Sequence, residues 1–110
     1  MTRNLFLFFG LLLASNVWSK SIVIDVRTID EWNQGHLSLA KRIEWQEIDI
    51  RISELTLDKG QEIILYCQSG NRSGKALKQL NELGFLNVIN AGGLFQAQEL
   101  TEDQIVSSDD

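Results

Sequence analysis

Three apolar runs alternate along the chain with amphipathic segments. The runs at 21–26 (SIVIDV) and 61–66 (QEIILY) are too uniformly apolar for a sheet with one face in water. They therefore predict strands that are covered on both faces. A shorter run at 87–90 (NVIN) predicts a last strand.

The segments between these runs predict helices. Thr28 and Glu31 have the spacing of a capping box, which predicts a short helix that ends at Gly35. Apolar residues recur at intervals of three and four over 46–55 and again over 76–83, as in amphipathic helices. The alternation predicts an α/β fold: a small, mostly parallel β-sheet flanked by helices on both faces.

Residues 1–19 have the pattern of a secretory signal peptide. Arg3 precedes the uncharged run 5–14, which is too short to span a bilayer comfortably. Val17 and Ser19 have the spacing of a small-residue cleavage site. We expect cleavage after Ser19 and a periplasmic protein that makes no membrane contact once the signal peptide is removed.

The remainder predicts one small domain over 20–100, followed by a frayed, acidic C-terminal tail at 101–110. The formal net charge of -5 argues against general binding to nucleic acid or anionic lipid. With one cysteine, Cys67, and one histidine, His36, the chain lacks the residues for an intramolecular disulfide or a usual Cys/His zinc cluster.

The position of Cys67 in the sequence predicts a reactive thiol. It comes directly after the apolar run 61–66 and begins a short loop into the next helix, and the ligands of parallel sheets bind at such strand ends. Amide groups of the turn and the positive end of the helix favour the thiolate, and cysteines in such places have pKa values of roughly 3.5 to 7.5. Gly70 lets the loop curl with its amides inward, and Arg72 supplies a cation.

At this point the chain resembles the rhodanese family, in particular its small, single-domain, secreted members. The resemblance spans residues 21 to about 95. It is carried, in order, by Asp25-Val26-Arg27, Glu31-Trp32, Gly35-His36-Leu37 with Ala40, Tyr66-Cys67-Gln68-Ser69-Gly70-Asn71-Arg72-Ser73, and Gly92-Gly93-Leu94.

The resemblance implies a sulfurtransferase. Cys67 would take the outer sulfur of thiosulfate or another small anionic sulfane donor, become a persulfide, and pass the sulfur to cyanide or a thiol. A protein is a further candidate acceptor. No cofactor and no metal are implied. The loop residues that would hold the persulfide, with the Arg72 side chain orienting the donor, are Gln68, Ser69, Gly70, Asn71 and Arg72.

The resemblance also implies structural roles for three residues. Asp25 and Arg27 are expected to form an ion pair that fixes the end of the first strand, and His36 is expected to be structural. The chain departs from the family pattern by having no proline, by Ser38-Leu39 where Pro-Gly is usual, and by Ala97 where an aromatic residue is common. These departures concern loop geometry and the pocket wall.

Three other functions remain open. A cysteine-dependent phosphatase shares the strand, loop and helix, but only four residues separate Cys67 from Arg72, where the phosphatases that resemble rhodaneses have five. A non-catalytic binding module of this fold usually lacks the cysteine. A persulfide carrier that serves a protein partner cannot be separated from a free-standing enzyme by sequence.

Overall fold

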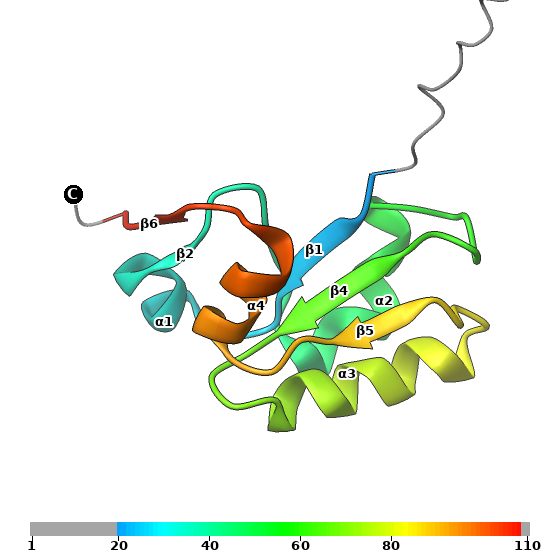
Figure 1. Cartoon of the computed structure of the whole chain (residues 1–110). Helices are drawn as coiled ribbons and strands as arrows, with labels where there is room; N and C mark the ends of the chain where they lie inside the picture. Colours follow the sequence, from blue (N-terminus) through cyan, green and yellow to red (C-terminus); the bar gives the residue numbers. More distant parts are fainter. Residues whose placement is uncertain (1–19, 109–110) are drawn as a thin grey trace, which may run out of the picture.

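The computed structural model describes residues 20–108 (Figure 1). The elements occur in the order β1 (Ile22–Asp25), α1 (Ile29–Gln34), β2 (His36–Leu37), β3 (Lys41–Arg42), η3 (Trp45–Glu47), α2 (Ile48–Arg51), η4 (Ile52–Glu54), β4 (Ile63–Tyr66), α3 (Asn71–Glu82), β5 (Val88–Asn90), α4 (Leu94–Thr101) and β6 (Ile105–Val106). The predicted α/β class is confirmed.

The main sheet has the strand order β3-β1-β4-β5, and all of its pairs are parallel. The two strands predicted from uniformly apolar runs, β1 and β4, are the central ones. In the register of the sheet Leu65 lies between Ile24 and Asn90. The carboxyl ends of β1, β4 and β5 therefore meet at one edge, where Cys67 stands just after β4.

Helices pack on both faces of this sheet, with α4 on one face and α2 and α3 on the other (Figure 1). Buried side chains form a cluster on each face. The larger cluster, beneath α2 and α3, consists of Ile24, Val26, Ile43, Ile48, Ile52, Ile63, Leu65, Cys67, Ala76, Leu80 and Phe85. The smaller, beneath α4, consists of Leu37, Ala40, Tyr66 and Ala97.

The predicted helices are present with two differences. The capping box is confirmed, since Thr28 Oγ1 accepts from Glu31 N and Glu31 Oε1 accepts from Thr28 N, and the helix ends at Gly35. The 46–55 segment is irregular: it is split into a 3₁₀ turn, one α-helical turn and a second 3₁₀ turn, although Ile48 and Ile52 are buried as expected. Helix α4 was not predicted.

The prediction of a frayed C-terminal tail is wrong for residues 101–108. Ile105–Val106 pairs antiparallel with His36–Leu37. Asp103 accepts hydrogen bonds from Ser38 Oγ at 2.7 Å and from Leu39 N at 2.8 Å. Asp103 therefore holds the C-terminal segment on the domain, because its carboxylate accepts hydrogen bonds from the turn at 38–39.

Ser38, which stands where the family usually has proline, also bonds this C-terminal segment through its backbone. Ser38 N donates to Gln104 O at 2.8 Å, and a proline has no N–H with which to make this bond. The altered loop is thus matched to the C-terminal segment that packs on it.

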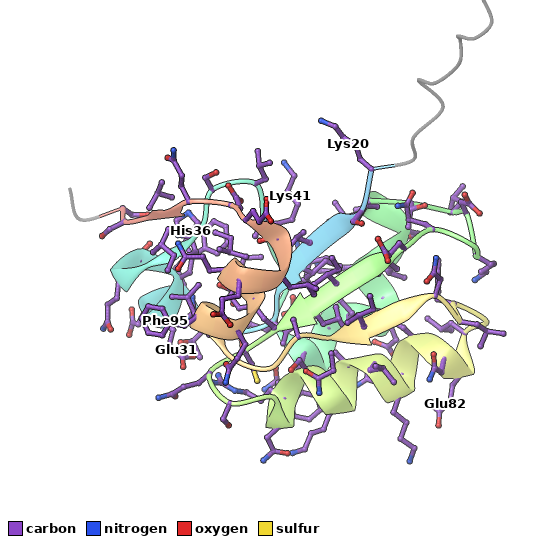
Figure 2. All side chains as sticks on the ribbon, in the orientation of Figure 1. Lys20, Glu31, His36, Lys41, Glu82 and Phe95 are labelled. Atoms are coloured by element: carbon purple, nitrogen blue, oxygen red, sulfur yellow. The ribbon has the colours of Figure 1, made fainter. Side chains whose placement is uncertain are left out.

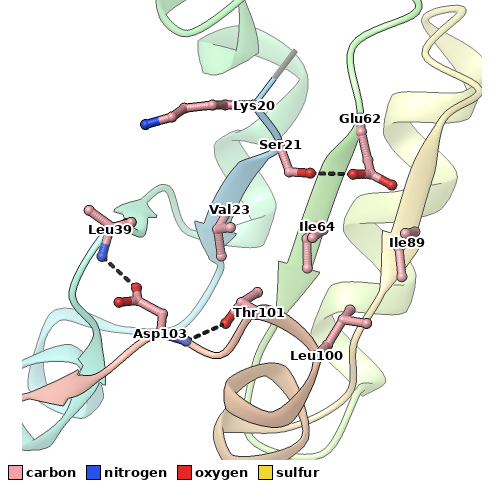
Figure 3. Close-up of a pocket in the computed structure, with 10 residues that line it drawn as sticks. All are labelled: Lys20, Ser21, Val23, Leu39, Glu62, Ile64, Ile89, Leu100, Thr101 and Asp103. Carbon is pink, nitrogen blue, oxygen red and sulfur yellow. Dashed lines mark hydrogen bonds between the residues drawn. The ribbon is translucent and has the colours of Figure 1, made fainter. Parts of the chain in front are cut away.

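Helix α4 leaves the amino-terminal end of its sheet face open (Figure 3). A cavity of about 430 Å³ lies there, with Val23, Ile64 and Ile89 from three adjacent strands among its lining residues. Leu39 and Leu100 also line it, and both are more than half exposed. This cavity is at the opposite end of the strands from Cys67.

The predicted signal peptide and its cleavage site at Ser19 lie outside the described residues. Within residues 20–108, no helix has the length and apolar character needed to cross a membrane.

Candidate active site

The direction of the Cys67 side chain is set by the alternation along β4. Ile63 and Leu65 point into the larger core cluster, and Cys67, two residues further on, points to the same face. Its backbone N–H donates to Gly92 O at 2.9 Å, which ties the strand end to the turn after β5. Cys67 is only 1% exposed.

Two backbone N–H groups and one hydroxyl surround the Cys67 sulfur. Gly70 N lies 3.0 Å and Ser73 N 3.5 Å from Sγ, and Ser73 Oγ lies 3.4 Å from it. Ser73 is the third residue of α3, so one of the free amides at the start of this helix points at the sulfur. The sulfur occupies the position that a capping side chain has in other helices.

The loop can curl in this way because Gly70 adopts φ +101°, a conformation that L side chains rarely adopt. A Cβ there would also lie 3.3 Å from Gly92 Cα. Gly93 has a different constraint: a Cβ on it would lie 2.4 Å from Gln68 O. The turn at 92–93 is thus in direct backbone contact with the cysteine loop.

This environment makes Cys67 an acidic thiol. Burial acts to raise the pKa, but hydrogen bonds from the Ser73 hydroxyl and from the amides of Ser73, Ser69 and Gly70 outweigh it. The net result is a pKa lowered to about 7. The direction of this shift agrees with the expectation from the loop sequence that the thiolate of Cys67 is favoured.

The remaining predicted loop residues occupy different positions. Gln68 and Ser69 are exposed, and Ser69 contributes its amide to the thiolate. Asn71 is exposed at the first position of α3. Arg72 reaches to α1, where its Nη1 and Nη2 donate to the two carboxylate oxygens of Glu31 at 2.7 and 2.8 Å.

The Glu31 carboxylate is firmly ionised. The hydrogen bond from Arg72 is the largest cause, and donors of Thr28 add to it, so its pKa is lowered to about 2. The sequence predicted Glu31 as a helix cap but not as the partner of Arg72, because the two residues are 41 positions apart. The cation of the cysteine loop is thus already neutralised by a fixed anion.

The expected ion pair between Asp25 and Arg27 is present. Arg27 Nη2 pairs with Asp25 Oδ2 at 2.7 Å and donates to Gly35 O at 2.6 Å, which fixes the end of β1 to the end of α1. His36 stacks on Trp32 with ring centroids 3.5 Å apart, and its Nδ1 lies 2.8 Å from Trp32 O. The His36 ring thus contacts Trp32, in the preceding helix, and not the Cys67 sulfur.

A cavity of about 500 Å³ adjoins the cysteine loop. Figure 2 shows Glu31 and Phe95, two of its lining residues, on the same side of the molecule. Its lining residues are Arg27, Glu31, Gln34, Gly35, Gln68, Leu94 and Phe95. Helix α4, missed by the sequence analysis, supplies its apolar wall.

Ser73 and Asn90, which were not predicted as site residues, form hydrogen bonds that hold the cysteine loop. Ser73 Oγ donates to Asn90 Oδ1 at 2.7 Å, and Asn90 Nδ2 donates to Gly70 O at 2.9 Å. The available signal was their placement: Ser73 comes directly after Arg72, and Asn90 ends a strand at the edge where Cys67 lies.

The geometry is that of a buried, acidic thiol in a cage of amides, and the similarity to known proteins agrees with it. The Rhodanese-like domain family matches residues 12–99, and the chain belongs to this family. It is 37% identical over 90 residues to thiosulfate sulfurtransferase PspE of Escherichia coli (strain K12), covering 77% of this chain and 86% of that protein.

Two further likenesses bear on fold and function. A solved structure described as a rhodanese with anions from E. coli superposes with a TM-score of 0.72 at 33% identity, over 80% of this chain and 99% of that one. The putative sulfur carrier protein YrkF of Bacillus subtilis (strain 168) is 35% identical over 68 residues, 62% of this chain but only 36% of that protein. The chain therefore has sulfurtransferase relatives as well as a relative named as a carrier.

Proposed function

We propose that this chain is a sulfurtransferase that carries a sulfane sulfur on Cys67 as a persulfide. The donor is thiosulfate or a similar small anion, and the acceptor is a thiol or cyanide. The observation that carries the proposal is the set of N–H groups of Gly70 and Ser73 directed at the Cys67 sulfur. Such a cage stabilises an anion on sulfur without supplying an acid or base.

The first step is attack by the Cys67 thiolate on the outer sulfur of thiosulfate. A new sulfur–sulfur bond forms to Cys67, the sulfur–sulfur bond of thiosulfate breaks, and its electron pair leaves with sulfite. The persulfide anion that results has the same charge as the thiolate it replaces. The loop amides of residues 68–72 would hold its terminal sulfur.

The second step returns Cys67 to its starting state. Cyanide or a thiolate attacks the terminal sulfur, the bond to Cys67 breaks, and thiocyanate or a new persulfide leaves. Neither step needs a proton from a protein side chain, which is consistent with the placement of His36 against Trp32 and away from the sulfur.

Steady-state kinetics test this function. Thiocyanate formation is measured with thiosulfate varied at fixed cyanide, and an aryl phosphate is offered to the same protein as a control. We expect turnover of thiosulfate and negligible phosphate release, because the four-residue spacing leaves a ring suited to one sulfur atom. Faster hydrolysis of the aryl phosphate than consumption of thiosulfate would replace the proposal with a phosphatase.

We further propose that the protein is exported to the periplasm and processed after Ser19. The support is the order of Arg3, the apolar run 5–14 and the cleavage-site spacing. N-terminal sequencing of the protein from a periplasmic fraction is expected to begin at Lys20. Recovery of the chain in the membrane fraction with Met1 in place would refute export and processing.

A further inference from the structure

Asn90, the last residue of β5, contacts every segment that surrounds the Cys67 sulfur. Its Nδ2 donates to Gly70 O at 2.9 Å. Its Oδ1 accepts from Ser73 Oγ at 2.7 Å and from Gly92 N at 3.0 Å. Each of these three residues also contacts Cys67: Gly70 and Ser73 at the sulfur, and Gly92 through its carbonyl oxygen.

The orientation of the Asn90 carboxamide is fixed by its backbone partners. The Gly70 carbonyl can only accept a hydrogen bond, and the Gly92 N–H can only donate one. A flipped amide would place donor against donor and acceptor against acceptor. The amide oxygen must therefore face Gly92 and Ser73, and it can only accept from the Ser73 hydroxyl.

The Ser73 hydroxyl has one proton and two neighbours that can take it. Asn90 Oδ1 is 2.7 Å from Ser73 Oγ, and Cys67 Sγ is 3.4 Å from it. When Cys67 is a thiol, its S–H can donate to Ser73 Oγ while the hydroxyl donates to Asn90. When Cys67 is a thiolate the sulfur can only accept, and a charged acceptor draws the hydroxyl proton to itself.

We propose that Asn90 is a positioning residue for Cys67: it holds the Gly70 and Gly92 backbone around the sulfur and competes with the sulfur for the Ser73 hydroxyl proton. Asn90 thereby sets how readily Cys67 becomes a thiolate. The inference deepens the proposed function and rests on it only in taking Cys67 as the reactive group.

The charged side chains at this edge do not offer an alternative control near neutral pH. Asp25 and Arg27 at the end of β1 pair with each other, and Glu31 on α1 pairs with Arg72 on α3. The pKa of Glu31 is lowered to about 2, and the pKa values of both arginines are raised. Further along the chain, β5 has no charged residue, and Glu99 on α4 is exposed.

The test is the substitution Asn90→Asp, read out by the pH dependence of Cys67 alkylation with iodoacetamide. Because Cys67 is the only cysteine in the chain, the whole signal belongs to it. Aspartate keeps the shape, adds a negative charge, takes the Ser73 proton more strongly and loses the donor to Gly70. We expect the midpoint to move up by about one pH unit or more. Asn90 is exposed, so the core is untouched.

Asn87→Asp is the matched control. Asn87 immediately precedes β5 at the far end of the strand, and its Nδ2 likewise donates to a backbone carbonyl, Gly60 O, at 3.2 Å. The same change of amide to carboxylate there is expected to leave the alkylation midpoint unchanged. An equal shift in both variants would overturn the proposal, since it would reflect only added charge. No shift in a folded Asn90→Asp protein would overturn it as well.

A double-mutant cycle with Ser73→Ala separates the hydroxyl from the loop contacts. If Asn90 acts through the Ser73 proton, the shift caused by Asn90→Asp is smaller in the Ser73→Ala background. Fully additive shifts would refute the competition for the proton. Alkylation needs no sulfur transfer, so a protein that fails to turn over thiosulfate but shows the coupled shift would remove the proposed function and leave the role of Asn90 intact.

Discussion

The two ends of the sheet carry cavities of similar size, but only one of them adjoins the cysteine loop. The cavity at the amino ends is about 430 Å³, and its lining combines the aliphatic side chains of Val23, Ile64 and Ile89 on the strands with charged residues such as Glu62 and Asp103. The cavity at the carboxyl ends is about 500 Å³ and adjoins the cysteine loop. Its lining includes Arg27, which is paired with Asp25, and the exposed residues Gln34 and Gln68. The presence of a cavity therefore does not by itself identify the reactive site of this protein.

The difference arises from the backbone at the two ends of the strands. Where β4 ends, the chain turns directly into α3, so loop and helix amides converge on one side chain. Where the strands begin, the amides are engaged in the sheet or in turns, such as Ile22 N with Glu62 O. We therefore expect the reactive site at the carboxyl end of the sheet, where free backbone N–H groups point at the Cys67 sulfur. Substitutions at both ends of the sheet test that expectation.

The largest effect is expected for Cys67→Ser. The hydroxyl is nearly the same size as the thiol but far less easily ionised, so sulfur transfer from thiosulfate should fall below detection. Far-ultraviolet circular dichroism should remain that of the folded protein. A folded Cys67→Ser variant that still forms thiocyanate would show that another group is the nucleophile.

A smaller but still large effect is expected for Gly93→Ala. The new Cβ would lie 2.4 Å from Gln68 O, so the cysteine loop must move. We expect a loss of stability of about 1–3 kcal/mol by thermal or denaturant unfolding, together with a fall in sulfur transfer of at least about tenfold.

Gly60→Ala is the control at the other end of the sheet. A Cβ there meets only Asp58 Oδ1 at 3.4 Å, and Gly60 is exposed. Stability and activity should change little. If both alanines lowered activity equally, the close approach of Gly93 to the loop would not be the cause.

Substitutions of Arg72 and Glu31 should change the KM for thiosulfate moderately and in opposite directions. Arg72→Ala removes the cation and should raise the KM for thiosulfate by about tenfold, with a smaller change in kcat, because the backbone amides still hold the persulfide. Glu31→Gln frees the guanidinium and should lower that KM. A neutral sulfur donor serves as the control, since its KM should respond to neither change. An unchanged thiosulfate KM in both variants would show that Arg72 does not meet the donor.

The smallest effect concerns stability against pH. The Cys67 pKa is lowered in the folded protein from an ordinary 9.0 to about 7, so between these values the unfolded chain binds more protons than the folded one. Stability should therefore rise as the pH is raised from 7 to 9, and this rise should level off above the pKa of the unfolded chain. Urea unfolding under reducing conditions measures this rise, and it should be absent in Cys67→Ser. An equal rise in that variant would assign it to other groups.

Local pattern predicted a large part of this molecule. The uniformly apolar runs identified β1 and β4 as central strands, and the Thr28 and Glu31 spacing identified the first helix. The cysteine loop was predictable because strand end, Gly70 and helix start are contiguous. These features depend on neighbours in sequence.

The missing parts depend on neighbours in space. Strand β6 has two residues and no periodicity to detect, and it is held by pairing with β2, far away in the chain. The Arg72 and Glu31 pair and the Asn90 contacts join segments that only the folded sheet brings together. The sequence therefore predicted Cys67 as the nucleophile but did not predict the groups that fix its surroundings.

The central claim is that Cys67 carries one sulfur atom, and intact mass spectrometry tests it most directly. The purified protein is measured before and after incubation with thiosulfate, and again after addition of cyanide, with Cys67→Ser in parallel. We expect a gain of the mass of one sulfur atom that cyanide reverses and that the variant lacks. An unchanged mass in the native protein, or the same gain in Cys67→Ser, would contradict the claim.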